Sequence, residues 1–178
     1  ISTLDQGRGV VYTTDKGVSW TMGSGIERTF KYNDINFLGG KVYLSGDGAV
    51  FLASGNDLTQ KWDLRLEQIE RETRCVASTS SGTIMVGTYT SDIEYNVLFV
   101  SSDKGKTWNS RKFPGYSPRS IEIVSDSIVY IADLHVIYKT DITCKTIDSI
   151  ANYIGFISDF KVAPNGTFFI CSRFSILS

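Results

Sequence analysis

Short apolar runs recur along the chain at intervals of 39 to 45 residues, and each begins with a turn residue. The runs are rich in β-branched and aromatic residues, which favours strands over helices. A period of this length indicates a repeated supersecondary unit. The four runs occupy residues 40–45, 82–87, 127–132 and 166–171.

Further apolar runs flank these strands. The run before each strand ends at a short turn, which predicts a hairpin. The run after it leads through a polar turn to a fourth run, so the predicted unit is a four-stranded antiparallel meander. Helical spacing is weak throughout, although the charged segment 64–73 is compatible with one helical turn. The flanking runs are 34–38, 74–77, 120–124 and 156–162 before, and 10–13, 49–53, 97–101, 136–140 and 174–177 after.

A four-stranded unit of this length cannot bury a face alone, and radial stacking of blades is the usual solution. We therefore predict an all-β fold, a β-propeller of four-stranded antiparallel blades with about four and a half blades present. Residues 1–4 are expected to form a second strand and residues 174–178 a third, so the two ends duplicate strands and leave the ring incomplete. The chain is expected to be one domain from a longer protein, completed by additional sequence or by another subunit. Second strands are predicted to start near residues 1, 41, 83, 128 and 167.

Composition excludes several classes of partner. Eighteen basic and nineteen acidic residues leave a net charge of -1, so no global field favours nucleic acid. The apolar runs are far shorter than the roughly 20 residues that a membrane-spanning helix needs. The sequence opens at Ile1 without a basic or apolar leader, so a targeting signal is expected to be cleaved or to lie elsewhere.

The cysteines and the one glycosylation sequon suggest structural roles. Cys75, Cys144 and Cys171 lack CxxC spacing, which argues against a zinc site or a disulfide framework. We expect Cys75 and Cys171 to be small buried residues. Asn165-Gly166 lies between two apolar runs and predicts a hairpin turn rather than a modified site.

An eight-residue pattern, Ser/Thr-x-Asp-x-Gly-x-Ser/Thr-Trp, occurs twice with its Asp residues 88 positions apart. The Asp and hydroxyl groups are expected to bind backbone amides of a tight turn, Gly to supply a positive φ, and Trp to pack back across the hairpin. One carboxylate per turn is too few for calcium, so no metal is predicted. The pattern residues are Thr13, Asp15, Gly17, Ser19 and Trp20, and Ser101, Asp103, Gly105, Thr107 and Trp108.

Two altered copies of the pattern lie at 54–62 and 139–147. The second has Thr143 where Gly belongs and Ile147 where Trp belongs. We expect looser turns in these two blades.

The pattern resembles the Asp-box or BNR repeat of sialidases, sortilin-type receptor propellers, xyloglucan-degrading glycosidases and photosystem II assembly-factor-like propellers. The resemblance implies that the box joins the third and fourth strands on the side away from the ligand face, and so has a structural role. It also implies a secreted, periplasmic or cell-surface protein.

Recognisable catalytic sets are missing. The resemblance to sialidases implies an arginine triad, but the Arg-Ile-Pro type motif of that family is absent. His135 is the only histidine, which leaves no basis for a Ser-His-Asp triad or a two-histidine metal site. Scattered acids do not define the facing carboxylate pair of a glycosidase. The sequence favours a non-catalytic module without a cofactor that binds a protein or a glycan, or assists assembly; a glycoside hydrolase fragment is the alternative.

In a meander blade, the loops from strand four to strand one and from strand two to strand three share one face. The loop 88–96 on that face is longer than its counterparts and mixes aromatic with acidic residues, which suits partner contact, although a solvated hairpin tip is the alternative. Arg74 and Arg119 are expected at equivalent positions of adjacent first strands, as a cationic rim or as ordinary surface residues. The candidate binding residues are Arg74, Tyr89, Asp92, Glu94, Tyr95, Tyr116, Arg119, His135 and Asp159, with Asp34 and Asp133 on the same face.

Overall fold

The structure of this chain is a computed structural model that describes residues 10–23, 31–38, 40–54, 62–67, 71–91, 96–152 and 155–172. These residues form sixteen β-strands and no helix, so nothing in them is a candidate helical membrane span. The all-β class is therefore confirmed. The strands expected at 1–4 and 174–178 lie outside the described residues.

The strands form antiparallel sheets in which spatial order follows chain order. Three sheets have four strands each, and we number the sheets as blades 1 to 5 along the chain. Blade 1 holds β1 (Val11–Tyr12) and β2 (Thr21–Met22); blade 2 holds β3 (Tyr32–Leu38), β4 (Lys41–Gly46), β5 (Ala49–Ser54) and β6 (Asp63–Glu67); blade 3 holds β7 (Glu72–Ser78), β8 (Ile84–Tyr89), β9 (Val97–Ser101) and β10 (Asn109–Lys112); blade 4 holds β11 (Ser120–Ser125), β12 (Ile128–Ala132), β13 (Val136–Thr140) and β14 (Ile147–Asn152); blade 5 holds β15 (Ile157–Val162) and β16 (Phe168–Ser172).

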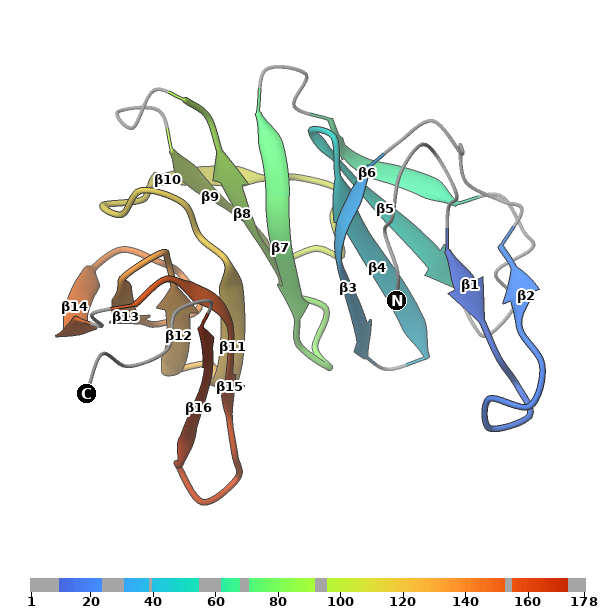
Figure 1. Cartoon of the computed structure of the whole chain (residues 1–178). Helices are drawn as coiled ribbons and strands as arrows, with labels where there is room; N and C mark the ends of the chain where they lie inside the picture. Colours follow the sequence, from blue (N-terminus) through green and yellow to red (C-terminus); the bar gives the residue numbers. More distant parts are fainter. Residues whose placement is uncertain are drawn as a thin grey trace.

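The blades are arranged radially, as expected for a propeller. Strands β3, β7, β11 and β15 contact one another in sequence, while β6, β10 and β14 lie at the periphery (Figure 1). Side chains join the inner strands directly: Asn33 Nδ2 donates to the Thr73 carbonyl at 2.8 Å, and the Val76 amide donates to Asp34 at 2.9 Å. The result is an incomplete ring of four-stranded antiparallel blades. The segment that was compatible with a helical turn instead contains β6 and the start of β7.

The core is divided among the junctions between blades. Val10 of blade 1 packs with Trp62 and Leu44 of blade 2, and similar apolar clusters lie between blades 2 and 3, 3 and 4, and 4 and 5. Each cluster draws on the alternating apolar residues of two neighbouring sheets, because a single blade has no partner for its own face. Burial at the junctions therefore fixes the position of one blade against the next.

The two intact patterns form closely similar turns between the third and fourth strands. Asp103 Oδ1 accepts the Lys106 and Thr107 amides at 3.0 and 2.9 Å, and Asp15 accepts the Ser19 amide at 2.9 Å. The expected amide contacts are thus present. Hydrogen bonding to the Thr107 side chain and amide holds the pKa of Asp103 well below its usual range. Gly105 has the expected positive φ of 81°, and Lys104 before it is also left-handed at 64°.

The tryptophan of the pattern has a contact that the sequence did not predict. Trp108 Nε1 donates to the Arg65 carbonyl at 2.7 Å, which belongs to β6 of the preceding blade. Gly105 allows this approach, because a Cβ there would lie 3.2 Å from the Arg65 Cβ. Trp62 is likewise buried against Val10 of blade 1. These tryptophans therefore contact the neighbouring blade, and Trp108 lies in one apolar cluster with Val97 and Phe99 of its own hairpin and with Leu66 of blade 2.

The altered copy at 139–147 forms a turn of another kind. Cys144, not Thr143, takes the left-handed conformation, with φ of 50°. Asp141 accepts the Thr143 amide at 2.7 Å and the Thr143 hydroxyl at 2.6 Å. Most of the other altered copy, at 54–62, lies outside the described residues.

Two smaller expectations have opposite outcomes. Cys75 is fully buried, but Cys171 is exposed because β16 is paired only with β15 in the described part of blade 5. The expectation of burial is wrong for Cys171. The Asn165-Gly166 turn is present: Asn165 Oδ1 accepts the Thr167 amide at 3.1 Å, and Gly166 has φ of 83°.

Candidate functional site

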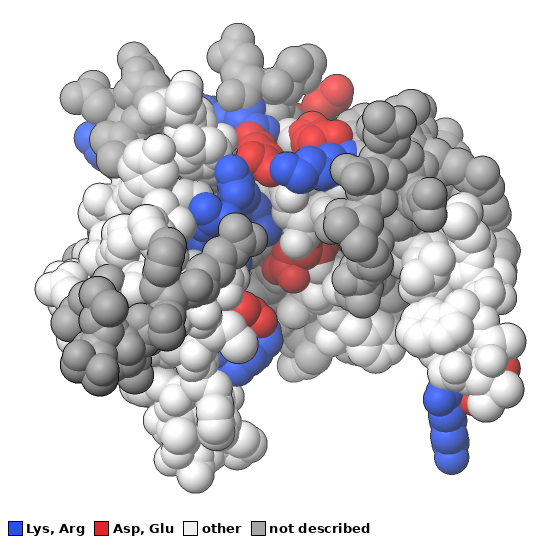
Figure 2. Space-filling view, viewed as in Figure 1, with Lys and Arg blue, Asp and Glu red and all other residues white. Residues whose placement is uncertain are grey.

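One face of the molecule carries the first residues of the inner strands and the last residues of the second strands. Glu72 at the start of β7 pairs with Tyr89 at the end of β8, and Ser120 of β11 pairs with Ala132 of β12. The turns with the Asp103 and Asp15 carboxylates join strands three and four at the opposite ends of the blades. Figure 2 shows basic and acidic side chains meeting over the inner strands near the middle of the molecule.

Arg74 lies at the centre of this face. It sits at an irregularity of β7, where the pairing with β8 shifts register between Thr73 and Cys75. Its Nη2 contacts Glu72 Oε2 at 2.7 Å, and its guanidinium lies 4.7 Å from the centre of the Tyr89 ring. The Arg74 and Glu72 side chains are only 21% and 23% exposed, so solvent screens their attraction less than on an open surface.

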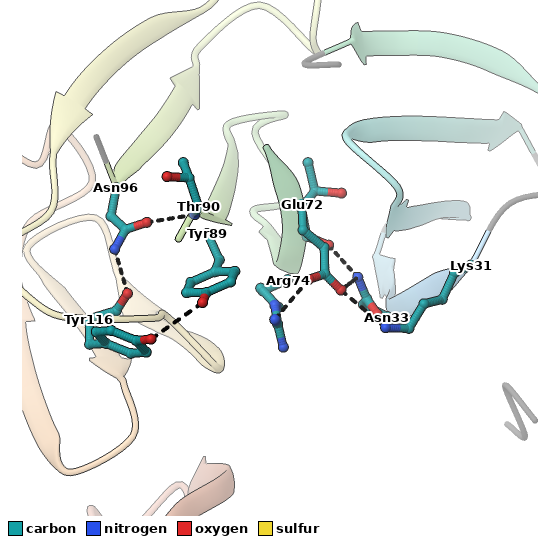
Figure 3. Close-up of polar contacts among 9 residues, drawn as sticks. Lys31, Asn33, Glu72, Arg74, Tyr89, Thr90, Asn96 and Tyr116 are labelled. Atoms are coloured by element: carbon teal, nitrogen blue, oxygen red, sulfur yellow. Dashed lines mark hydrogen bonds and ion pairs between the residues drawn. The ribbon is translucent and has the colours of Figure 1, made fainter. Parts of the chain in front are cut away.

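Glu72 also connects blade 3 to blade 2. Its Oε1 accepts Asn33 Nδ2 at 3.0 Å and lies 3.4 Å from Lys31 Nζ (Figure 3). Asn33 is fixed by its second bond, to the Thr73 carbonyl at 2.8 Å. Arg74 is therefore oriented by a carboxylate that is itself held by two residues of the neighbouring blade.

Tyr89 and Tyr116 form an aromatic pair beside Arg74. Their ring centres are 5.7 Å apart and their hydroxyls 3.3 Å apart (Figure 3). The hydrogen bond with Tyr116 raises the pKa of Tyr89. Asn96 fixes the loops on both sides, since its Nδ2 donates to the Tyr116 carbonyl and its Oδ1 accepts the Thr90 amide at 2.9 Å. Tyr116 is 41% exposed and is available for contact.

Asp133 continues the network into blade 4. It is 3% exposed and accepts three amides: Tyr116 at 3.0 Å, and His135 and Val136 at 2.8 Å each. The exposed His135 ring lies 3.0 Å from the Gly155 carbonyl through Nδ1. We call the whole set the arc. Its members are Lys31, Asn33, Glu72, Arg74, Tyr89, Asn96, Tyr116, Asp133 and His135.

The remaining candidates lie on neighbouring inner strands or outside the described residues. Arg119 immediately precedes β11 and donates its amide to the Ala132 carbonyl at 2.7 Å. It comes just before Ser120, which pairs with Ala132, as Arg74 comes just before Cys75, which pairs with Gly87, so the two arginines hold the expected equivalent positions. Asp159 is on β15, where its Oδ1 accepts the Phe160 amide at 2.8 Å. The loop residues Asp92, Glu94 and Tyr95 are outside the described residues.

Asp34 is the one carboxylate of the inner strands whose pKa is clearly raised. Burial raises it to about 6, against the opposing effect of amide hydrogen bonds from Val76 and Ile35. Those bonds are 2.9 and 2.8 Å long and occupy one oxygen each. Both Asp34 and Asp133 therefore hold backbone amides in place, which is a structural use of a carboxylate. No group of three metal-ligating side chains occurs within the described residues.

Four members of the arc, Lys31, Asn33, Glu72 and Asn96, are not among the binding residues predicted individually from the sequence. Glu72 could have been found, because it stands two residues before Arg74, where the predicted strand 74–77 begins. Asn33 and Lys31 could not be identified from the sequence, because their contacts with Glu72 cross between two blades.

The fold is shared with several solved structures. YCF48 bound to a D1 peptide is 20% identical with a TM-score of 0.60, over 80% of this chain and 46% of that one. YCF48 from Cyanidioschyzon merolae is 19% identical with a TM-score of 0.61, over 80% and 50%. A protein of unknown function from Bacteroides caccae is 10% identical with a TM-score of 0.61, over 87% and 57%.

At these identities the likeness shows the propeller fold alone. The chain spans about half the length of the structures it matches. No protein-family model matches the sequence, and no curated protein does.

Proposed function

We propose that this propeller segment is a non-catalytic binding module that holds a peptide segment of a partner protein against the arc. One observation carries the proposal: Arg74 is fixed between the Glu72 carboxylate at 2.7 Å and the Tyr89 ring at 4.7 Å, next to the exposed Tyr116. Arginine and tyrosine are the side chains that contribute most often to recognition surfaces.

The rigidity of the arc supports binding. Tyr89 and Tyr116 hold each other, and Asn96 and Asp133 hold the backbone that carries Tyr116. Little side-chain freedom remains to be lost when a ligand arrives, and the entropic cost of association falls accordingly. Arg74 offers charge to a peptide carboxylate or carbonyl, while the tyrosines offer flat apolar area and hydroxyls.

The fold likeness supports a peptide as the ligand in a limited way. YCF48 has the same fold and was solved bound to a D1 peptide. A propeller of this kind can therefore hold a peptide, and the arc supplies suitable chemistry here. The amide-binding turns at Asp15 and Asp103 support the resemblance to Asp-box propellers. On that resemblance we place the protein outside the cytoplasm.

The engagement of the carboxylates supports a role without catalysis. A glycosidase needs one carboxyl group to protonate the leaving group and another to act as nucleophile or base. Asp34 and Asp133 both have their oxygens occupied by backbone amides. We expect no release of sialic acid or xyloglucan oligosaccharides by the complete protein. Turnover that disappears with Asp34→Ala, Asp133→Ala or Asp159→Ala would assign the segment to the hydrolases instead.

A random peptide library displayed on phage tests the proposal. Peptides are selected on the wild-type protein and then measured against Arg74→Met and Tyr116→Leu, with Lys106→Met in the turn on the opposite face as the matched control. We expect about tenfold weaker binding to the first two variants and unchanged binding to the control. Equal binding of the selected peptides to all four proteins would contradict a peptide ligand. A glycan array that shows sugars binding through Arg74, when no peptide does, would contradict it as well.

A further inference from the structure

The junctions between blades differ in how their outer part is filled. Trp62 fills the junction of blades 1 and 2, and Trp108 fills that of blades 2 and 3. At the junction of blades 3 and 4 the corresponding residue is Ile147. Ile147 is the first residue of β14 and pairs with Thr140, the last residue of β13. The register of β9 and β10, continued by one residue, places Trp108 opposite Ser101 in the same way.

The turn before Ile147 confirms this correspondence. Cys144 takes the left-handed conformation that Gly105 has in the intact pattern. Gly105 lies against the Arg65 side chain of blade 2, and the turn of blade 4 likewise contacts an arginine of the preceding blade, Arg111. Arg111 Nε donates to the Thr143 carbonyl at 3.3 Å.

An open pocket of about 350 Å³ has Ile147, the residue at the tryptophan position, in its lining. Its size is at the lower end of the range found for small-ligand pockets. We call it the junction cavity. It is lined by Arg111, Lys112, Pro114, Cys144, Lys145 and Ile147.

The lining of the junction cavity combines apolar and cationic residues. Cys144 and Ile147 pack into the core of the blade 3 and 4 junction. Arg111 uses Nε and Nη1 for the Thr143 and Ser110 carbonyls. Within the described residues none of the ion pairs involves a cation of this cavity.

One carboxylate lies close to these cations. Lys145 contributes to the lowered pKa of Asp141, although hydrogen bonds from Thr143 are the main cause. The Asp141 carboxylate is engaged by Thr143, and it does not line the cavity. Three cations therefore face the cavity without a carboxylate among its lining residues.

We propose that the junction cavity binds a flat apolar ring that carries an anionic group. The ring would occupy the place that Trp62 and Trp108 fill in the other junctions, and the anion would lie against Lys112 and Lys145. A free aromatic acid and an aromatic side chain beside an acidic residue of a partner share this chemistry. The site is on the periphery of the blades and is separate from the arc.

Indole-3-acetate is the probe, and its binding is followed by isothermal titration. Indole-3-acetamide is the matched neutral ligand, and acetate alone tests the anion. Two variants test the site: the double variant Lys112→Gln with Lys145→Gln, and the single variant Ile147→Trp. The double variant Lys16→Gln with Lys106→Gln is the control for loss of the same charge elsewhere. The peptide acetyl-DWD-amide is titrated in parallel.

We expect indole-3-acetate to bind the wild-type protein and the control alike, and the double Lys112 and Lys145 variant about tenfold more weakly. Indole-3-acetamide should bind more weakly than the acid, and acetate not measurably. Ile147→Trp should abolish binding and raise Tm, because the indole then fills the cavity. Tighter binding of the peptide assigns the site to a partner protein, and tighter binding of the free acid assigns it to a small molecule.

Two results would overturn the proposal. One is the absence of indole-3-acetate and peptide binding at millimolar concentration. The other is equal affinity in the wild-type protein and in the double lysine variant, which remains informative even when Ile147→Trp does not fold.

Discussion

The indole of Trp108 donates a hydrogen bond to the backbone carbonyl of Arg65, at 2.7 Å, across the junction between two blades. A tryptophan that local pattern assigns to a hairpin therefore stabilises the contact between neighbouring repeats. Because the core is divided among such junctions, the turn that positions Trp108 also contributes to the packing of one blade against the next.

Trp108→Phe should lower the free energy of unfolding. The change keeps most of the apolar contact and removes the donor to the Arg65 carbonyl, which costs about 1 kcal/mol. Trp20→Phe is the matched control, because Trp20 holds the same place in the other intact pattern but is 61% exposed. Urea denaturation measures both. An equal loss of unfolding free energy in the two variants would show that Trp108 does not stabilise the protein through its bond to the neighbouring blade.

Asp103→Ala should lower Tm more than Asp148→Ala, which removes an exposed strand carboxylate. Asp103 accepts two amides and a hydroxyl within its turn, whereas Asp148 is an exposed residue of β14. Because the pKa of Asp103 is depressed in the folded state, its contribution is complete above about pH 4 and declines as the pH falls below that value. The difference in Tm between wild type and Asp103→Ala should therefore shrink in acid. A constant difference between pH 7 and pH 2 argues against this ionised role.

Asp34 should give the opposite pH dependence. Burial raises its folded pKa to about 6, while the unfolded chain releases this proton near pH 4. The contribution is complete below about pH 4 and is lost as the pH rises to about 6. Wild type should thus lose stability relative to Asp34→Asn across this interval in urea titrations. Parallel profiles for the two proteins would contradict the raised pKa.

Gly115→Ala should destabilise the loop that carries Tyr116. A Cβ at this position would lie 2.6 Å from a carbon of the Phe113 ring and would also meet Asp133 Oδ2. Overpacking of this kind typically costs about 1 to 3 kcal/mol. Gly166→Ala is not a suitable control because Gly166 is left-handed, so Ser110→Ala on the exposed strand β10 serves instead. Unchanged Tm and unchanged peptide binding would show that the loop is not held by Asp133 as described.

The fold could be predicted from the sequence because the strand and turn patterns that indicate it are local and repeated. The spacing of the strands near 41, 83, 128 and 167 matches the observed starts at Lys41, Ile84, Ile128 and Phe168. Turn chemistry at Asp103 and at Asn165-Gly166 was equally readable, since each depends on neighbours within a few residues.

The candidate site could be predicted from the sequence only in part. Topology predicted which face would carry Arg74, Tyr89 and Tyr116, but not that these three would be in contact. The bonds that fix them, such as Asn33 to Glu72 and Asn96 to Tyr116, join positions 39 and 20 residues apart. Contacts of this range depend on blade packing. The same limit explains why the bond from Trp108 to the Arg65 carbonyl was not predicted.

Hydrogen–deuterium exchange of the protein, with and without a selected peptide, tests the central claim most directly. We predict slower exchange at 71–74, 88–91, 115–119 and 133–136, because these backbones carry the arc. The turns at 13–20 and 101–108 on the opposite face should exchange at unchanged rates. Protection confined to those turns, or spread without preference over both faces, would contradict the assignment of partner binding to the arc.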